Sequence, residues 1–255
     1  MKPFLTLAET HTPDGSRFTL HEHDGEYFMT LNGRQLMSTS STASELLLAQ
    51  KSCAGLSRHG HPRVLIGGLG LGFSLRRALE LVGPRGTVQV AELLGEVVAW
   101  NRDFLQSVNG ALLDDARVEV LVADVFEVIR RSNNDCYDAI LLDVDNGPTS
   151  FVQSKNSRIY NRRGLGLISR ALKPSGRVAF WSAVDEPEFP SSLARAGFNI
   201  EVFEAKAHDC AKQSPHRIYV AERPAAELEV SVGKAHALTR GLAERRKSEL
   251  HRGRK

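Results

Sequence analysis

Cysteine is scarce in this 255-residue chain, which has only three, Cys53, Cys136 and Cys210. Their number is odd, they lie far apart and they form no C-x-x-C pair, which excludes a disulfide framework and a cysteine-based zinc site. The histidine pairs at 21 and 23 and at 59 and 61 are expected to be solvated or capping residues rather than metal ligands. The sequence therefore predicts no metal, and free thiols fit a reducing cytoplasm.

Long apolar runs are absent as well. No segment approaches the roughly 18 to 20 apolar residues that cross a bilayer, and residues 1–14 lack the apolar stretch of a signal peptide. The composition is 42% hydrophobic and 25% charged, with 21 Gly and 10 Pro, which excludes collagen-like and wholly disordered chains. We expect a soluble, cytoplasmic protein without a membrane partner, with one large domain and a small appendage.

A strong net charge is missing from most of the chain. The total is +3, but residues 234–255 alone hold eight Lys or Arg against two Glu, so the basicity belongs to the end segment. This segment lacks the interleaved aromatic residues that stack on bases, so a nucleic-acid partner is not favoured. We expect residues 224–255 to form a basic tail, helical or disordered.

The first forty residues alternate apolar and polar types between turn signals, the strongest being Asn32-Gly33, which fits a type I′ hairpin turn. This pattern predicts a small antiparallel β-meander over 1–41. Next, Thr42 and Glu45 have the spacing of a capping box, which predicts the start of a helix that leads into the main domain, 42–223.

From Arg63 onward, short β-rich runs alternate with helical stretches, which is typical of a doubly wound parallel sheet. Two further runs without a helix between them predict an antiparallel hairpin that closes the sheet. We therefore expect an α/β fold with a mostly parallel, seven-stranded, Rossmann-like sheet. The seven runs are Val64–Ile66, Val88–Ala91, Val118–Val122, Ala139–Leu142, Val178–Trp181, Phe198–Ala205 and Arg217–Ala221.

The first of these runs leads directly into a glycine loop, with Gly68, Gly70 and Gly72 ahead of a helical stretch. Glycines at a helix N-terminus let the backbone approach a ligand closely. The third glycine is one residue early for an NAD loop, whereas Glu92, at the end of the next strand, is well placed for a ribose diol. Loop and acid together predict a nucleoside site.

Three more acids follow strands. Asp124 is a candidate for the adenine amino group, with a helix N-cap as the alternative. Asp143 and Asp145 come after the fourth buried strand, where a carboxylate can accept a proton from an attacking amine or hold a cation. The alternative for this pair is a loop-shaping turn. Tyr160 is either a pocket residue or a packing aromatic.

These motifs resemble the spermidine synthase (polyamine aminopropyltransferase) family, within the class I AdoMet-dependent methyltransferase fold. The family's glycine motif G-G-G-D-G-G matches Gly67 to Gly72, its V-E-I-D acid matches Glu92, and its D-x-x-D-P-x-G-P loop resembles the segment that begins at Asp143. The resemblance covers about 31–223 and includes the N-terminal β-domain.

The resemblance implies a role for each matching residue. Asp143 would be the general base and Asp145 a polyamine-binding carboxylate, while Glu92 would bind the ribose and Asp124 the adenine. Gln35 lies near the position of a family glutamine that touches the cofactor, but it is not in register with it. Decarboxylated AdoMet or AdoMet would be the co-substrate, a small amine the acceptor, and a homodimer is implied.

The chain departs from the family at the amine end. Gly70 occupies the slot of the family aspartate that holds the amine of decarboxylated AdoMet, and Ile66 stands where many methyltransferases have an acid. Ala43 replaces a family tyrosine, and the acidic loop is two residues shorter. Despite these departures, the first hypothesis remains the one that the resemblance implies, aminopropyl transfer to an amine such as putrescine. The alternatives are an AdoMet-dependent small-molecule methyltransferase and a nucleoside-binding protein without turnover.

Overall fold

The computed structural model describes residues 4–144, 157–208, 210–211 and 215–225. These belong almost entirely to one compact unit, Met1–Pro224, so the small and the large sheet can be described together. The expected basic tail, 224–255, lies outside the described residues except for its first two positions. Within the described residues, no helix combines the length and the apolar character that a membrane crossing requires.

The N-terminal meander is confirmed. Strands β1 (Leu5–His11), β2 (Arg17–His23), β3 (Glu26–Leu31) and β4 (Arg34–Ser38) form an antiparallel sheet in chain order. Asn32 and Gly33 both have positive φ, 49° and 80°, as a type I′ turn requires. The pairing of β3 with β4 slips by one residue, so that Leu36 is a bulge between Gln35 and Met37.

The seven-stranded sheet is also confirmed, with the order β10-β11-β9-β8-β5-β6-β7. Strands β5 to β9 are parallel neighbours, whereas β11 runs antiparallel to both β9 and β10, as the hairpin prediction requires. The strands are β5 (Arg63–Gly67), β6 (Thr87–Glu92), β7 (Val118–Val122), β8 (Tyr137–Leu142), β9 (Leu172–Ser182), β10 (Asn199–Ala205) and β11 (His216–Glu222).

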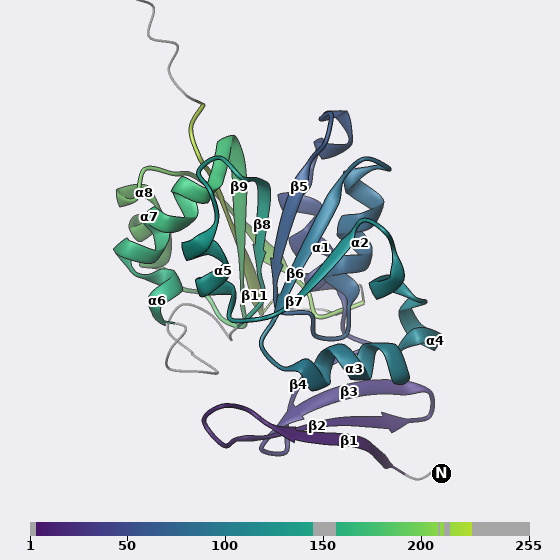
Figure 1. Ribbon diagram of the computed structural model, residues 1–255. Coiled ribbons are helices and arrows are strands. Elements are labelled where there is room, and N and C mark those ends of the chain that lie inside the picture. The colour runs from purple at the N-terminus through teal and green to yellow at the C-terminus, as the bar shows by residue number, and fades with distance from the viewer. Residues whose placement is uncertain (1–3, 145–156, 209, 212–214, 226–255) are drawn as a thin grey trace, which may run out of the picture. The chain divides into compact units, whose positions relative to one another are not determined.

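Helices cover both faces of this sheet, giving three layers (Figure 1). Helices α1 and α2 pack on one face, and α5, α7 and α8 on the other. The helices, with two short 3-10 turns η1 and η2, are α1 (Ala43–Ser52), η1 (Leu56–Arg58), α2 (Phe73–Val82), α3 (Gly95–Asp103), α4 (Gln106–Asn109), η2 (Leu112–Asp114), α5 (Val125–Arg131), α6 (Ser157–Tyr160), α7 (Arg162–Ala171) and α8 (Phe189–Arg195).

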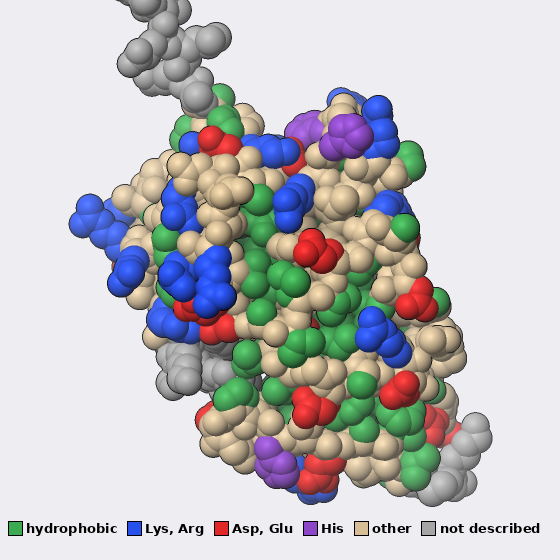
Figure 2. Space-filling model, viewed as in Figure 1, with side chains coloured by type: hydrophobic (Ala, Val, Ile, Leu, Met, Phe, Trp, Pro, Cys, Tyr) green, Lys and Arg blue, Asp and Glu red, His purple; other side chains and the backbone are tan. Residues whose placement is uncertain are grey.

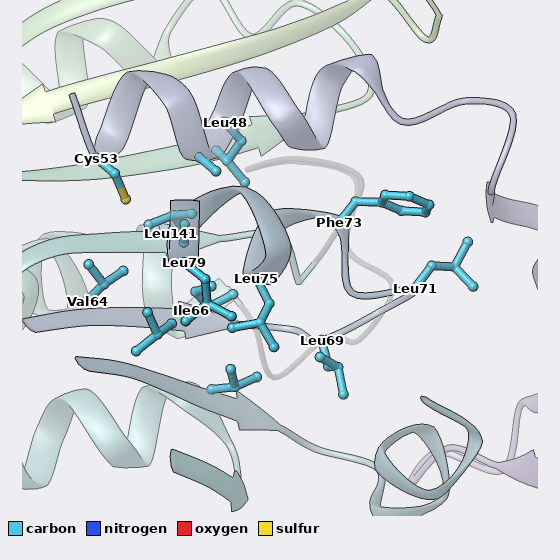
Figure 3. Packing of buried hydrophobic residues seen from close by; sticks show 14 of the residues in the cluster. Leu48, Cys53, Val64, Ile66, Leu69, Leu71, Phe73, Leu75, Leu79 and Leu141 are labelled. Carbon is cyan, nitrogen blue, oxygen red and sulfur yellow. The ribbon is translucent and has the colours of Figure 1, made fainter. Parts of the chain in front are cut away.

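Each face has its own apolar core because successive strand residues point to opposite sides. Val64 and Ile66 of β5 join the core beneath α1 and α2, which Figure 3 shows with Leu48, Leu75 and Leu79 among its members. Leu65, between them, joins the core on the other face. Burial on both faces explains why these strands are continuously apolar in the sequence.

The small sheet shares the first of these cores. Phe18, Leu20 and Met29 of β2 and β3 are buried in the same cluster as Trp100 of α3. The rings of Phe18 and Trp100 stack with centroids 5.8 Å apart and an interplanar angle of 9°. This contact places the small sheet against α3, at the edge of the large sheet where the parallel strands end.

One local prediction is wrong. Thr42 does precede α1, but its side chain makes no capping hydrogen bond. Glu45 does not complete a capping box, because its carboxylate lies along a pocket and accepts a hydrogen bond from the Ser44 hydroxyl at 2.6 Å. Tertiary contacts therefore override the local motif at this helix end.

Candidate active site

A pocket of about 170 Å³ opens at the carboxyl ends of the parallel strands. Ligands of doubly wound sheets bind at this edge. The wall of the pocket combines residues of the glycine loop, the strand ends, α1 and the small sheet. The lining residues are Thr12, Phe18, Leu31, Leu36, Met37, Glu45, Gly68, Gly70, Ala91, Glu92, Leu93, Leu94, Val97, Ala123, Asp124, Val125, Asp143, Val144 and Trp181.

The glycine loop needs its glycines for steric reasons. Gly68, Gly70 and Gly72 have φ of 89°, 51° and 89°, the left-handed region that other residues rarely adopt. A Cβ on Gly68 would collide with the backbone carbonyl oxygen of Asp143. Close packing of the β5 and β8 ends therefore brings the predicted base directly beside the loop. Gly72 does not line the pocket and instead caps α2.

Glu92 holds the loop in place from the end of β6. Its two carboxylate oxygens accept the backbone N–H groups of Leu69 and Leu94, at 2.8 and 2.9 Å. Burial raises the pKa of Glu92 above its ordinary value, while these N–H groups oppose the shift. A carboxylate has lone pairs left for further donors, so the same side chain can also accept ribose hydroxyls from within the pocket.

Asp124 forms the helix cap that the sequence left open as an alternative. One oxygen accepts the Phe126 N–H at 2.8 Å at the start of α5, and the other pairs with Arg158 at 2.6 Å. Asp124 also lines the pocket. Asp124 can therefore cap α5 and also contact a ligand, because its two partners hold the side chain at the pocket wall.

Asp143 and Glu45 share the pocket wall although they come from distant parts of the chain, the end of β8 and the first turn of α1. Burial raises the pKa of Asp143 to about 7, and the nearby Glu45 carboxylate adds to the shift. Burial also raises the pKa of Glu45. A carboxyl group with a pKa near neutrality is suited to accept a proton during a reaction.

Apolar side chains fill the space beside Gly70. A Cβ on Gly70 would lie 2.9 Å from the sulfur of Met37, which is closer than real contacts allow. Leu36 and Met37 both line the pocket, although neighbouring strand residues normally point to opposite faces. The bulge at Leu36 explains this exception, because it breaks the alternation along β4.

No Lys, Arg or His occurs among the described residues that line the pocket. Positive charge gathers elsewhere: Figure 2 shows Lys and Arg side chains over the region of α5, α6 and α7. Trp181, at the end of β9, adds a buried indole N–H for which the described residues offer no acceptor. The described wall of the pocket therefore combines acidic and apolar side chains and has no cationic one.

Besides Gly72, two predicted site residues do not line the pocket, Gln35 and Tyr160. Gln35 is exposed on β4 and does not line the pocket. Tyr160 is buried and packs its ring against Phe180 and Phe189, with centroids 5.8 Å away from each. This is the packing position that the sequence left open for it. Asp145 lies outside the described residues, so its role stays a prediction.

Sequence reasoning missed four contributors to the site, namely Glu45, Met37, Trp181 and Arg158. Glu45 carried a signal that pointed to a helix cap, and nothing local marked Met37 as the neighbour of Gly70. Trp181 was recognisable as the end of a strand, which is the same signal that identified Glu92 and Asp143. Position at a strand end was therefore the more reliable indicator.

The site region matches known proteins. The family model for the spermine/spermidine synthase domain matches residues 51–189. A polyamine aminopropyltransferase of Hyperthermus butylicus is 27% identical over 168 residues, which are 64% of this chain and 55% of that protein. One from Bacillus mycoides is 34% identical over 146 residues, 56% of this chain and 49% of that one. The chain spans about half the length of these curated relatives.

A solved structure agrees with the fold. The crystal structure of spermidine synthase from Thermotoga maritima aligns with a TM-score of 0.66 and 18% sequence identity, covering 86% of this chain and 73% of that one. At this identity the likeness shows the fold alone.

Proposed function

Because this chain belongs to the spermine/spermidine synthase family, we propose that it transfers an aminopropyl group from decarboxylated AdoMet to an amine such as putrescine. The observation that carries the proposal is the acidic pocket, where Asp143 has a pKa of about 7 and no cation lines the described wall. Such a wall favours cationic substrates and provides an acceptor for a proton. Neither methyl transfer nor binding without turnover is favoured by a specific feature of the pocket.

The reaction is a substitution at carbon. The amine nitrogen of the acceptor attacks the aminopropyl carbon that is bonded to the sulfonium, so a C–N bond forms while the C–S bond breaks. The bonding electrons go to sulfur, which becomes the neutral thioether of 5′-methylthioadenosine. The attacking nitrogen gives up one proton, which Asp143 is placed to accept.

The remaining residues position the donor. Glu92 would accept hydrogen bonds from the ribose hydroxyls, and Asp124, fixed by Phe126 N–H and Arg158, would face the adenine. The glycine loop lets the backbone approach the nucleoside, and the apolar wall excludes water from the reacting atoms. Correct placement of two bound substrates supplies much of the rate in such reactions. A cytoplasmic location and a homodimer stay predictions of the sequence.

The test is a product assay with binding measurements alongside. The chain is incubated with decarboxylated AdoMet and putrescine, and separately with AdoMet and an amine panel, and the products are identified by mass spectrometry. We expect spermidine and 5′-methylthioadenosine in the first mixture. Methylated amines from AdoMet without polyamine products, or nucleoside binding without any turnover, would contradict the proposal. Glu92→Gln should weaken 5′-methylthioadenosine binding in calorimetry, with NAD as the negative control ligand.

A further inference from the structure

Both proposed substrates end in primary ammonium groups, and the pocket must neutralise them. A charged group moved from water into a largely apolar pocket costs free energy unless it meets an opposite charge or hydrogen-bond acceptors. The position of Gly70 supplies no charge, because glycine has no side chain and the Met37 side chain occupies the space beside it. The ammonium partner must therefore come from another part of the wall.

Four carboxylates line the pocket, and two of them are already engaged. Glu92 accepts two backbone N–H groups, and Asp124 pairs with Arg158 at 2.6 Å. Glu45 and Asp143 have no Lys, Arg or His partner among the described residues. Asp143 is required as the proton acceptor in the proposed reaction. Glu45 is then the carboxylate of the described wall that is left for a lasting ion pair.

The local structure holds Glu45 in position. Ser44, which is buried, donates its hydroxyl hydrogen to a Glu45 carboxylate oxygen at 2.6 Å. The backbone carbonyl of Glu45 accepts the Ser74 hydroxyl of α2 at 3.4 Å, which connects this first turn of α1 to the helix that follows the glycine loop. A carboxylate fixed by its surroundings loses little side-chain entropy when it binds a ligand.

We propose that Glu45 is a substrate-binding residue that holds a primary ammonium group beside Asp143. The inference rests on the proposed function and assigns the amine end of the pocket, which the sequence left without a partner. The ammonium has two sources, the aminopropyl end of the donor and an end of the acceptor. Because the Glu45 carboxylate is a negative charge close to Asp143, it also raises the pH at which Asp143 loses its proton.

The test measures binding to Glu45→Gln, which keeps the shape and removes the charge. The first arm compares decarboxylated AdoMet with 5′-methylthioadenosine, which lacks the aminopropyl group and its ammonium. The second arm titrates putrescine into protein saturated with 5′-methylthioadenosine. We expect one arm to lose roughly 10- to 100-fold in affinity, the range of a hydrogen bond to a charged group. The arm that changes identifies the source of the ammonium.

The affinity for 5′-methylthioadenosine should stay within about twofold, the scatter of exposed substitutions. Glu96→Gln is the matched control, because Glu96 is an exposed glutamate in the first turn of α3. If the affinity is unchanged in both arms, the proposal is overturned. An equal loss for all three ligands would overturn it too, since it would show general damage. Glu45→Met, a second uncharged variant of similar length, replaces Glu45→Gln if that variant does not fold.

A kinetic measurement separates ammonium binding from the electrostatic effect on Asp143. In the wild type, kcat/KM should rise with pH as Asp143 loses its proton near pH 7. The other charged side chains of the described pocket wall are Glu45, Glu92 and Asp124, and Glu45 is the one that shifts the pKa of Asp143. Glu45→Gln should move this limb to lower pH, and an unmoved limb would contradict the pairing. If the wild type neither binds nor converts the substrates, the proposed function fails. If the wild type is active and the Glu45 variants behave in the same way, this inference alone fails.

Discussion

An aspartate stands at each end of strand β8, Asp138 within the strand and Asp143 directly after it, and the two side chains have different surroundings. Asp138 accepts hydrogen bonds from the Lys173 ammonium at 2.6 Å, the Arg63 backbone N–H at 2.8 Å and His59 at 3.1 Å. Burial alone would raise the pKa of Asp138, but these partners hold it below its ordinary value. Asp143 has no such partners among the described residues, and its pKa rises to about 7.

The comparison shows how one strand serves two purposes. At the amino end of β8, the Asp138 carboxylate is held by groups of β5, of β9 and of His59, the residue after η1, which ties these segments together. At the carboxyl end, the charge faces a pocket and a second carboxylate. Unpaired carboxylates at a pocket cost stability and are characteristic of functional sites. The same residue type is therefore structural at one end and, by our proposal, catalytic at the other.

The largest expected effect is on turnover. Asp143→Asn removes the proton acceptor while keeping nearly the same shape, so aminopropyl transfer should fall by roughly 10²- to 10⁴-fold. Steady-state production of 5′-methylthioadenosine measures the loss. Asp114→Asn is the matched control, because Asp114 is exposed in η2. Activity near the wild-type level in Asp143→Asn would contradict the role of Asp143 as the proton acceptor.

The other aspartate should affect stability instead. Asp138→Ala leaves the Arg63 N–H and the Lys173 ammonium without their acceptor, which should cost about 1–3 kcal/mol of unfolding free energy. The cost is limited because the Lys173 side chain is 36% exposed and can turn to water. Urea unfolding measures it, and kcat of the folded fraction should hardly change. A strong loss of kcat with unchanged stability would reverse the two roles.

The sequence predicted the parts of the site that depend on strand ends. Glu92 and Asp143 were identified because each follows a short β-rich run, and the glycine loop because three glycines stand between a strand and a helix. Glu45 escaped because its partner Asp143 is far along the chain, and its local pattern indicated a capping box. Met37 escaped because a bulge, which has no clear sequence signal, turns it toward Gly70. Long-range packing decides both positions.

The backbone of the glycine loop, which follows β5 at the pocket, should tolerate less change than ordinary loop positions. Gly70→Ala puts a Cβ on a residue with φ of 51° and against the Met37 sulfur, so we expect a loss of about 1–2 kcal/mol in stability. Met37→Ala in the same chain should recover the steric part but not the backbone part. A double-mutant cycle by urea unfolding should show a coupling of about 0.5 kcal/mol or more. Full additivity would contradict the contact.

The smallest expected signal is the pH dependence of stability. The pKa of Asp143 is about 7 in the folded chain and near 3.8 when exposed, so the folded state binds more protons between these values. The contribution of Asp143 is fully present below about pH 3.8 and is lost as the pH rises through 7. Asparagine does not titrate, so the Tm of Asp143→Asn minus that of the wild type should grow with pH and level off above 7.

Asp143 is only partly buried, so solvent screening reduces the effect, and we expect a difference of about 2–4 °C at pH 8, equivalent to about 1 kcal/mol. Thermal melts from pH 4 to 9 measure it, and other titrating groups largely cancel in the difference. Asp138→Asn should show the opposite sign, because the folded pKa of Asp138 lies below its ordinary value. The loss of stability in Asp138→Asn relative to the wild type is present at neutral pH and fades only in acid. Equal pH profiles for the two variants would mean that the ends of β8 do not differ electrostatically.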